Sequence, residues 1–426
     1  MRVIFLTLTF APEPGALRGL PLAKWLATRG YDVKILTAFP NYPRGRVYPG
    51  YRIRPWQWEV MDNIRVLRVP IYPSHDTSAI RRILTYLSFA FAAATIGAAL
   101  IGPADVVYFY DPPPTNGIAS LVLKLFRRMP IVHTIGDMWP ETVVHSGMIR
   151  DERIGRWVNF LLGRWCRFLY RHAEVVTVLS PGFKRLLVER GVPEDKIKII
   201  YNWAEDVYRP VTRDESLARK LSFEGRFNFV YAGNFGPFQA VDTIVKAAAL
   251  VRERSEIQIV LIGTGPREKE VKELVARLAL HNVRFLERRQ YWEMPAIYGL
   301  ADVLVVHMKD IPFLRDTIPS KTQVSLACGR PILMAVSGDA ADLVERAGAG
   351  LICPSEDPAA MAAAMLKMAA LPKSQLERMA SSGREYYLTQ LSLETAGDRM
   401  DAIFREVVER RSKNRGRAAA VYRARS

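Results

Sequence analysis

The chain has 426 residues, which is too long for one ordinary hydrophobic core and suggests two domains of about 200 residues each. Hydrophobic residues make up 49% of the chain and charged residues 24%, a balance that excludes a disordered protein. The net charge of +17 favours an anionic partner, which leaves nucleic acid, acidic lipid and a phosphorylated substrate open.

The first half of the chain alternates strand-like and helix-like runs. The opening apolar stretch is too short for a signal peptide and is interpreted as a buried strand, so we expect a cytoplasmic protein. A helix over residues 17–29 follows it. Strands separated by helices predict a parallel sheet covered on both faces. The strands expected here are residues 3–8, 32–37, 64–69, 106–109, 131–135 and 175–179.

The same alternation restarts after Trp203 and predicts a second domain of the same α/β kind. Its expected strands are residues 227–232, 257–262, 283–286, 303–307 and 332–335, with helices over 241–254 and 268–279 between them. The expected divisions are an N-terminal domain over 1–205, a C-terminal domain over 206–390, a final helix over about 393–410 that returns to the first domain, and a disordered basic tail over 411–426.

Residues 83–104 carry no charged side chain over 22 positions, which is long enough to cross a bilayer. The segment is rich in Ala, Thr, Ser and Gly, so its insertion energy is weak, and it leads directly into the strand over 106–109. We therefore expect a buried or interfacial helix.

Residues 151–172 predict a helix with a basic stripe. At 100° per residue its arginines fall within an arc of roughly 80°, with aromatic side chains inside or beside that arc. Such a mixture suits the headgroup region of an anionic membrane, and a solvated polar face is the alternative. The residues predicted to contact the membrane are Arg153, Arg156, Trp157, Arg164, Arg167, Phe168 and Arg171.

Two glycine-bearing loops follow the first strand of each expected domain, one with Gly15 and one with Gly233 and Asn234. Glycine lets the backbone approach a phosphate at the strand ends, where open α/β sheets bind their ligands. Ser320 and Lys321 stand at the start of an expected helix, where a lysine opposes the helix dipole and points to a bound anion such as a diphosphate. A ligand-free turn and a surface lysine are the alternatives.

Three carboxylates follow strands of the first domain. Asp111 ends one strand, and Asp137 and Glu141 follow the next. Asp137 or Glu141 would orient acceptor hydroxyls or act as a base, and Asp137 would alternatively cap the local structure. The chain has no D-x-D pair, no P-loop, no G-x-G-x-x-G and no zinc-like histidine spacing, so neither a metal ion nor ATP or nicotinamide chemistry is expected.

Taken in order, seven segments of the chain resemble the family-4 retaining glycosyltransferases with the GT-B fold. The resemblance is greatest to the bacterial subgroup that builds lipid-linked O-antigen and exopolysaccharide repeats, of the colanic-acid and fucosamine-transferase kind. The segments are residues 39–45, 137–141, 201–203, 233–234, 263–266, 319–321 and 329–331.

The resemblance implies two Rossmann-like doubly wound domains that face each other across a cleft. The first would bind an acceptor and the second a nucleotide sugar, usually a UDP-sugar, with transfer that retains the anomeric configuration and uses no metal. The implied catalytic residues are Asp137, Asp316 and Lys321. The implied donor-binding residues are Gly15, Gly233, Asn234, Gln239, Gly263, Arg288 and Ser320 together with Lys321, and the implied acceptor-binding residues are Asp111 and Glu141.

Asn234 and Gln239 stand where many members of this family carry an arginine and a lysine, so Lys321 would supply the missing positive charge. The leading interpretation is transfer from a UDP-sugar to an undecaprenyl-diphosphate-linked acceptor at the cytoplasmic face of the inner membrane, by a peripheral enzyme that does not bind nucleic acid. A UDP-sugar 2-epimerase with the same fold and an inactive nucleotide-sugar-binding subunit are the alternatives.

Overall fold

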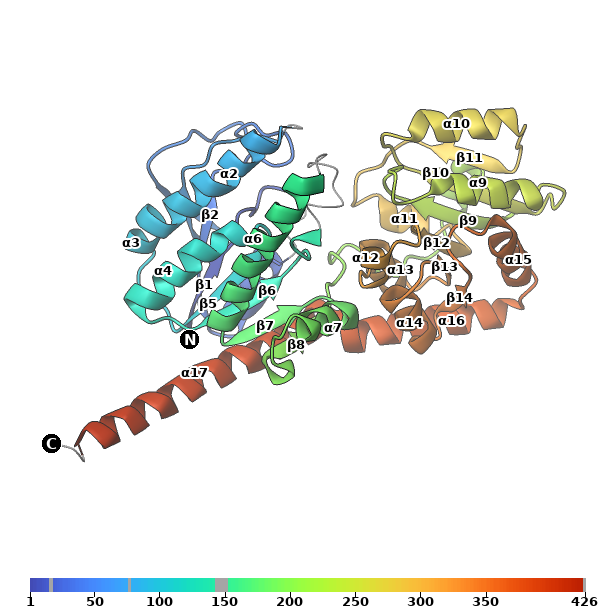
Figure 1. Cartoon of the computed structure of the whole chain (residues 1–426). Helices are drawn as coiled ribbons and strands as arrows, with labels where there is room; N and C mark the ends of the chain where they lie inside the picture. The colour runs from blue at the N-terminus through green and yellow to red at the C-terminus, as the bar shows by residue number, and fades with distance from the viewer. Residues whose placement is uncertain (15–17, 76–77, 142–151, 424–426) are drawn as a thin grey trace. The chain divides into compact units, whose positions relative to one another are not determined.

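The computed structural model describes residues 1–14, 18–75, 78–141 and 152–423 (Figure 1). The chain divides into two compact units, one formed by Met1–Tyr201 with Ala396–Ser426 and the other by Asn202–Thr395. Each unit has its own parallel sheet with helices on both faces, which is the Rossmann-like architecture expected from the sequence.

An eight-stranded sheet in the order β3-β4-β2-β1-β5-β6-β7-β8 forms the centre of the first unit. All neighbouring strands are parallel except β3, which runs antiparallel to β4 at the edge. The inner strands are continuous apolar runs because helices cover both of their faces. The strands are β1 (Arg2–Leu6), β2 (Asp32–Ala38), β3 (Gln57–Met61), β4 (Ile64–Val69), β5 (Val106–Asp111), β6 (Ile131–Ile135), β7 (Val175–Val178) and β8 (Ile197–Ile199).

Helices α2, α4 and α6 form a layer in the first unit (Figure 1). Helix α4 contacts α2 on one side and α6 on the other, where a Cβ on Gly117 would lie 2.5 Å from a Leu169 methyl carbon. Trp165 of α6 donates from Nε1 to the Pro114 carbonyl at 3.0 Å. The helices of this unit are α1 (Leu20–Thr28), α2 (Ala79–Ala92), η1 (Ala93–Gly97), α3 (Ala98–Leu100), η2 (Pro114–Asn116), α4 (Gly117–Arg127), α6 (Glu152–His172), α7 (Pro181–Glu189) and η3 (Glu194–Lys196).

The uncharged segment forms α2, the π-helical turn η1 and α3 in direct succession. Within the described part of the chain, one helix, Ile80–Leu100, is long and apolar enough to cross a membrane. It packs along the sheet, since Phe89 and Ala93 are fully buried and a Cβ on Gly97 would lie 2.7 Å from a methyl carbon of Leu36 in β2. One face of the segment is therefore core, as expected for a buried or interfacial helix.

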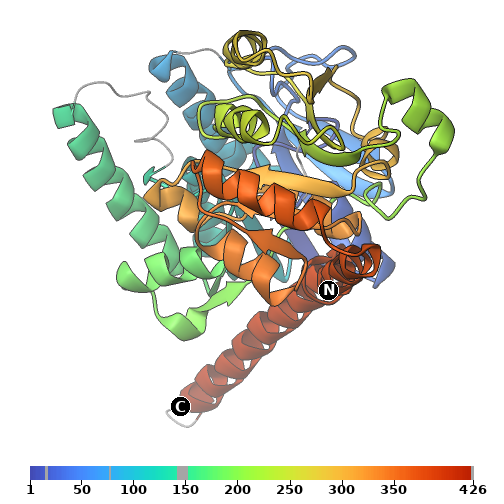
Figure 2. The ribbon, with the colours of Figure 1, turned by 90° about the vertical axis from the view of Figure 1, so that its right-hand side faces the viewer.

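Helix α17 (Leu393–Arg423) begins in the second unit and belongs to the first from Ala396 onward. It packs on α1, where a Cβ on Gly397 would lie 2.5 Å from the Trp25 ring, and its Asp401 accepts a hydrogen bond from Tyr31. Figure 2 shows it as one long helix. The predicted end near residue 410 and the predicted disordered tail are wrong as far as Arg423, because the Arg, Lys and Ala residues of this stretch favour a helix.

The second unit contains a six-stranded parallel sheet in the order β11-β10-β9-β12-β13-β14. Its strands are β9 (Phe227–Ala232), β10 (Ile257–Ile262), β11 (Val283–Leu286), β12 (Val303–His307), β13 (Ile332–Ala335) and β14 (Gly350–Ile352). Its helices are α8 (Glu215–Leu221), α9 (Val241–Leu250), α10 (Glu268–Arg277), α11 (Met294–Tyr298), α12 (Pro312–Arg315), α13 (Ser320–Ala327), α14 (Asp339–Arg346), α15 (Pro358–Ala369), α16 (Lys373–Tyr386) and η4 (Tyr387–Leu391).

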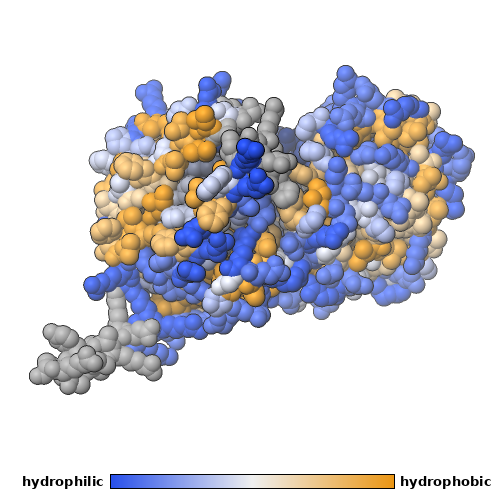
Figure 3. Space-filling view, in the orientation of Figure 1, coloured by the Kyte–Doolittle hydropathy of each residue, from blue (hydrophilic) through white to orange (hydrophobic). Residues whose placement is uncertain are grey.

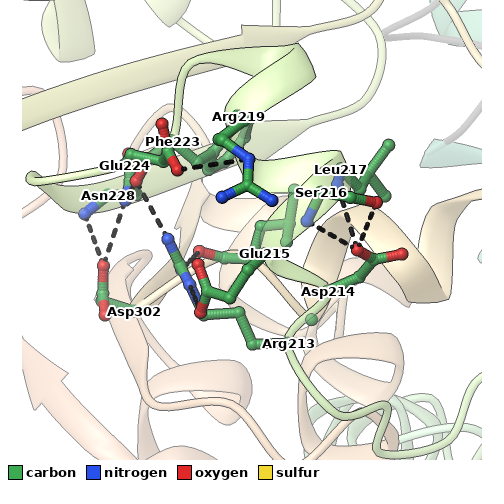
Figure 4. A network of polar contacts seen from close by, with 12 residues as sticks. Arg213, Asp214, Glu215, Ser216, Leu217, Arg219, Phe223, Glu224, Asn228 and Asp302 are labelled. Atoms are coloured by element: carbon green, nitrogen blue, oxygen red, sulfur yellow. Dashed lines mark hydrogen bonds and ion pairs between the residues drawn. The ribbon is translucent and has the colours of Figure 1, made fainter.

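A network of polar contacts joins the start of β9 to the start of β12 (Figure 4). Asp302, just before β12, accepts hydrogen bonds from the backbone N–H of Asn228 in β9 at 2.7 Å and from its side chain. Arg213 donates to the carbonyls of Phe223 and Leu300 at 3.0 and 2.8 Å. These contacts fix the N-terminal ends of β9 and β12. They thereby hold in place the two strands whose C-terminal ends carry the loops described below.

Candidate functional site

The loops that follow β9 and β10 meet at two glycines. The N–H of Gly233 donates to the Ile262 carbonyl at 2.9 Å. A Cβ built on Gly263 would lie 1.8 Å from the Gly233 carbonyl oxygen, and Gly263 has φ of +147°. Only glycine fits at Gly263, so the backbone itself forms the surface at the C-terminal edge of these strands. Ligands of open α/β sheets bind at this edge.

Lys321, in the first turn of α13, lies against this glycine surface. A Cβ on Gly233 would lie 2.3 Å from Cε of Lys321, so the absence of a side chain at Gly233 makes room for the lysine. The Lys321 ammonium donates to the Tyr231 hydroxyl at 2.7 Å and lies 4.1 Å from the centroid of the Tyr231 ring. Strand β9, its glycine loop and the start of α13 therefore place one positive charge at the sheet edge.

Burial lowers the pKa of Lys321 from 10.5 to about 7. In the described part of the chain no carboxylate pairs with its ammonium, although part of the side chain remains accessible to solvent. A desolvated cation without an acid is costly to the folded chain. An anion bound at this place would remove that cost, and the neighbouring N-terminus of α13, preceded by Pro319 without a side-chain cap, would add backbone N–H groups.

Asn234 and Gln239 lie on the loop that follows the glycine surface, where the Asn234 carbonyl accepts a hydrogen bond from the Tyr231 hydroxyl at 2.8 Å. A Cβ on Gly236 would lie 2.5 Å from Nδ2 of Asn234 and 2.5 Å from Oε1 of Gln239. The Gln239 carbonyl accepts a hydrogen bond from Nδ1 of buried His307 at 2.8 Å, and Nε2 of His307 accepts from a backbone N–H. Burial lowers the pKa of His307, so the imidazole is neutral and holds the Gln239 loop in place.

The other described residues that are predicted to bind the donor lie at three different places in the second unit. Ser320 is exposed at the start of α13, beside Lys321. Asp316 is half-buried where α12 ends, on the segment that leads to α13. Arg288 is exposed after β11, which is the edge strand, and no hydrogen bond or ion pair of the described residues joins it to Lys321. Gly15 lies outside the described residues.

In the first unit, Asp111 at the end of β5 pairs with His133 of the neighbouring strand β6. Oδ2 of Asp111 and Nε2 of His133 are 3.2 Å apart, and both side chains are buried. Burial raises the pKa of Asp111, while the hydrogen bond and charge of His133 lower it. The prediction that Asp111 binds the acceptor directly is wrong, because a side chain that is 2% exposed acts only through its neighbours.

Asp137 is exposed in the loop after β6. The surrounding protein still removes part of the water around its carboxylate. This desolvation, and then the negative charge of Asp111, raise the pKa of Asp137 to about 6. The adjacent Gly136 donates its N–H to the Asp111 carbonyl at 2.6 Å, and a Cβ there would lie 2.7 Å from the Tyr110 hydroxyl. The tight turn thus presents an accessible carboxylate that is ionised at neutral pH, as a group that orients or deprotonates a hydroxyl must be.

Glu141 is half-buried and forms an ion pair with Arg190, which also donates to the Trp139 carbonyl at 2.9 Å. One carboxylate oxygen of Glu141 is therefore engaged in holding the 137–141 segment. Arg190 is 49 positions away in the chain, and no sequence pattern points to it.

Glu13 was also missed. Its buried carboxylate accepts the N–H groups of Phe10, Asn41 and Tyr42 at 3.0, 2.7 and 2.8 Å. It thereby joins the loops that follow β1 and β2. Burial raises the pKa of Glu13, and these hydrogen bonds lower it. An acidic residue within a proline-rich loop after a strand is the only sequence signal that would have singled it out.

The predicted basic stripe lies on α6. Arg153, Arg156, Trp157 and Phe160 line a shallow pocket near the start of the helix. Arg164, Phe168 and Arg171 are exposed, and Arg167 is half-buried. Among the described residues, Arg156, Arg164, Arg167 and Arg171 form no ion pair with a carboxylate. The described residues also contain no group of three or more His, Cys, Asp or Glu that could hold a metal ion.

Two family models match the chain. Residues 18–203 match the glycosyl transferase 4-like domain, and residues 226–370 match the glycosyl transferases group 1. The chain is 23% identical over 349 residues to the putative colanic acid biosynthesis glycosyl transferase WcaI of Escherichia coli, covering 77% of this chain and 82% of that one. It is 27% identical over 274 residues to the probable glycosyltransferase WbjE of Pseudomonas aeruginosa, covering 63% and 66%.

The fold is shared with solved structures at low identity. Anabaena Alr3699/HepE in complex with UDP-glucose superposes with a TM-score of 0.67 at 15% identity and covers 95% of this chain and 100% of that one. The two matched domains follow each other in the chain in the same order as the two sheets, and each covers all or most of one sheet. The chain is therefore a glycosyltransferase with the GT-B fold, built from a glycosyl transferase 4-like domain and a group 1 glycosyl transferase domain.

Proposed function

We propose that the chain transfers a sugar from a UDP-sugar to a polyprenyl-diphosphate-linked acceptor, with retention of anomeric configuration and without a bound metal ion. The observation that carries this proposal is the desolvated Lys321 ammonium against the glycine surface of β9. A diphosphate is the anion that this charge and the N-terminus of α13 together suit. The UDP-glucose complex of HepE, which has the same fold, supports a uridine nucleotide as the donor.

In the proposed reaction the bond between the sugar C1 and the UDP oxygen breaks, and a bond forms between C1 and an acceptor hydroxyl oxygen. Negative charge develops on the departing diphosphate, where Lys321 and the backbone N–H groups stabilise it more in the transition state than in the ground state. The acceptor hydroxyl gives its proton to the oxygen of the departing diphosphate, and Asp137 orients that hydroxyl in the acceptor-binding unit.

A lipid-linked acceptor and a place at the cytoplasmic face of the inner membrane are part of the proposal. The similarity to WcaI, a putative colanic acid biosynthesis glycosyl transferase, supports a polysaccharide product. Arg156, Arg164, Arg167 and Arg171 of α6 have no carboxylate partner among the described residues, and with the exposed aromatic side chains of this helix they support an anionic membrane surface as the place of action.

The test is a panel of UDP-sugars incubated with a polyprenyl-diphosphate-linked sugar acceptor, with UDP release measured and the product anomer determined by proton NMR. The proposal expects acceptor-dependent release of UDP with one donor and a product of retained configuration. Inversion at C1 would refute retention. An epimerised sugar formed from donor alone, without acceptor, would instead establish the 2-epimerase alternative.

A further inference from the structure

Helix α2 presents a stripe of apolar side chains to solvent. Ile80, Ile83, Leu84, Leu87 and Phe91 recur at the spacing of one helical face, and Ile80 and Phe91 are 73% and 72% exposed. Apolar residues of a helix that packs on a sheet ordinarily point toward the sheet. On α2 both faces are apolar. The inner face, with Phe89 and Ala90, is buried in the core, and the outer face carries the exposed stripe.

The end of α4 extends this stripe. Leu125 and Phe126 are 70% and 82% exposed, and α4 contacts both α2 and α3. Arg127 at the end of α4 donates to the Ala99 carbonyl of α3 at 2.9 Å, which fixes the two helices against each other. Figure 3 shows hydrophobic side chains gathered over this part of the first unit. The residues of this apolar face are Ile80, Ile83, Leu84, Leu87, Phe91, Leu125 and Phe126.

The charged residues within the helices that form the apolar face are all basic. Neither α2–α3 nor α4 contains an acidic residue, and α4 ends in Arg127-Arg128. Helix α6 packs against α4 on its other side and carries the exposed Arg164 and Arg171, which have no carboxylate partner within the described residues. An apolar centre bordered by arginines is complementary to an anionic bilayer, in which acyl chains lie beneath negative headgroups.

The helix cannot leave the unit to span the bilayer without opening the core. Gly97 packs directly on Leu36 of β2, and Phe89 and Ala93 are fully buried. A transmembrane orientation would expose these contacts. Only the outer stripe is available to lipid, so insertion must be shallow, with the helix in the plane of the membrane.

We propose that the apolar face of α2 and α4 inserts into the acyl-chain boundary of an anionic bilayer while the α6 arginines bind its headgroups. The inference deepens the proposed function by assigning its membrane contact to particular helices, and it rests on that function only for the lipid-linked acceptor. It predicts two separable parts of the binding, one that resists salt and one that salt removes.

The experiment is sedimentation of the full chain with phosphatidylcholine vesicles that contain about one third phosphatidylglycerol, at low salt and at about 0.5 M NaCl, where the Debye length is on the order of 4 Å. Phe91→Ser with Phe126→Ser removes the two largest inserted side chains. Leu250→Ser with Leu388→Ser, two exposed leucines of the second unit, is the matched control. Arg164→Glu with Arg171→Glu removes the headgroup contact.

The wild type and the leucine control are expected to bind equally and to remain partly bound at high salt. The phenylalanine variant should lose about tenfold or more of its vesicle partitioning and be released fully by salt. The arginine variant should lose low-salt binding and keep the salt-resistant fraction. UDP binding in solution, measured for every variant, keeps a failure of the donor site distinct from a failure of docking.

Equal vesicle binding by the phenylalanine variant and the leucine control would overturn the proposal. So would a wild type that self-associates in light scattering and becomes monomeric in the phenylalanine variant without any change in vesicle binding, since a second copy would then cover the face.

Discussion

Replacing Lys321 with methionine should make the chain more stable and at the same time weaken donor binding. The pKa of Lys321 falls from 10.5 to about 7 on folding, and one pKa unit corresponds to about 1.4 kcal/mol. The charged ammonium therefore costs the folded chain at most about 5 kcal/mol, and contact with the Tyr231 ring and residual solvent access reduce that cost. We expect Lys321→Met to gain on the order of 2 kcal/mol at pH 6.5.

The gain depends on pH in a defined direction. Between pH 7 and 10.5 the folded wild type binds fewer protons at Lys321 than the unfolded chain, so wild-type stability rises with pH through this window. The advantage of Lys321→Met is therefore largest at and below pH 7 and fades toward pH 10.5. Urea unfolding at pH 6.5 and pH 9 measures the difference in unfolding free energy between Lys321→Met and the wild type. The control is Lys269→Met, because the Lys269 side chain is 88% exposed.

Donor affinity should change in the opposite sense. A charge-assisted contact is worth about 1.5–3 kcal/mol, so Lys321→Met should bind UDP about ten- to a hundredfold more weakly by calorimetry. In the wild type, UDP affinity should fall as pH rises above 7, by about tenfold per pH unit at most. A Lys321→Met variant that is less stable than the wild type at pH 6.5, or that binds UDP equally well, would refute the reasoning.

Three further predictions concern the same sites. Gly233→Ala should weaken UDP binding in calorimetry and leave the circular dichroism spectrum unchanged, because its Cβ would displace the Lys321 side chain; unchanged binding would contradict the packing. Asp137→Asn should slow transfer and abolish the loss of rate that we expect of the wild type below pH 6, where the carboxylate becomes protonated. EDTA should leave the rate of UDP release unchanged, since Lys321 and the start of α13 meet the diphosphate charge; a loss restored by Mg²⁺ would refute metal independence.

The strands could be predicted closely from the sequence because parallel strands buried on both faces are continuous apolar runs. Residues 64–69, 131–135, 227–232 and 257–262 were expected as strands and are β4, β6, β9 and β10. The edge strand β3 was missed because it is half-exposed, with Trp58 and Val60 facing solvent. Strands β8 and β14 have three residues each, too few for a periodic pattern.

The donor-site residues could be located by sequence, but their contacts could not. Lys321 was singled out because a lysine at a helix start opposes the helix dipole. Its partner Tyr231 is 90 positions away and is brought beside it only by the position of α13 relative to β9. The same holds for Asp111 and His133, whose pairing follows from the neighbouring positions of β5 and β6.

The apolar face of α2 and α4 shows a further limit of sequence patterns. The segment over 83–104 is apolar all round, and periodicity alone does not distinguish a buried helix from one that is half-exposed. Packing of Gly97 on Leu36 decides which face is core and which is left to solvent.

The central claim is that a desolvated lysine at the edge of the second sheet meets the diphosphate of a nucleotide sugar. Acceptor-dependent UDP release by the wild type, Lys321→Met and Lys269→Met, measured side by side at pH 7, tests it most directly. We expect equal rates for the wild type and Lys269→Met and a rate at least about tenfold lower for Lys321→Met. Equal rates for all three proteins would contradict it.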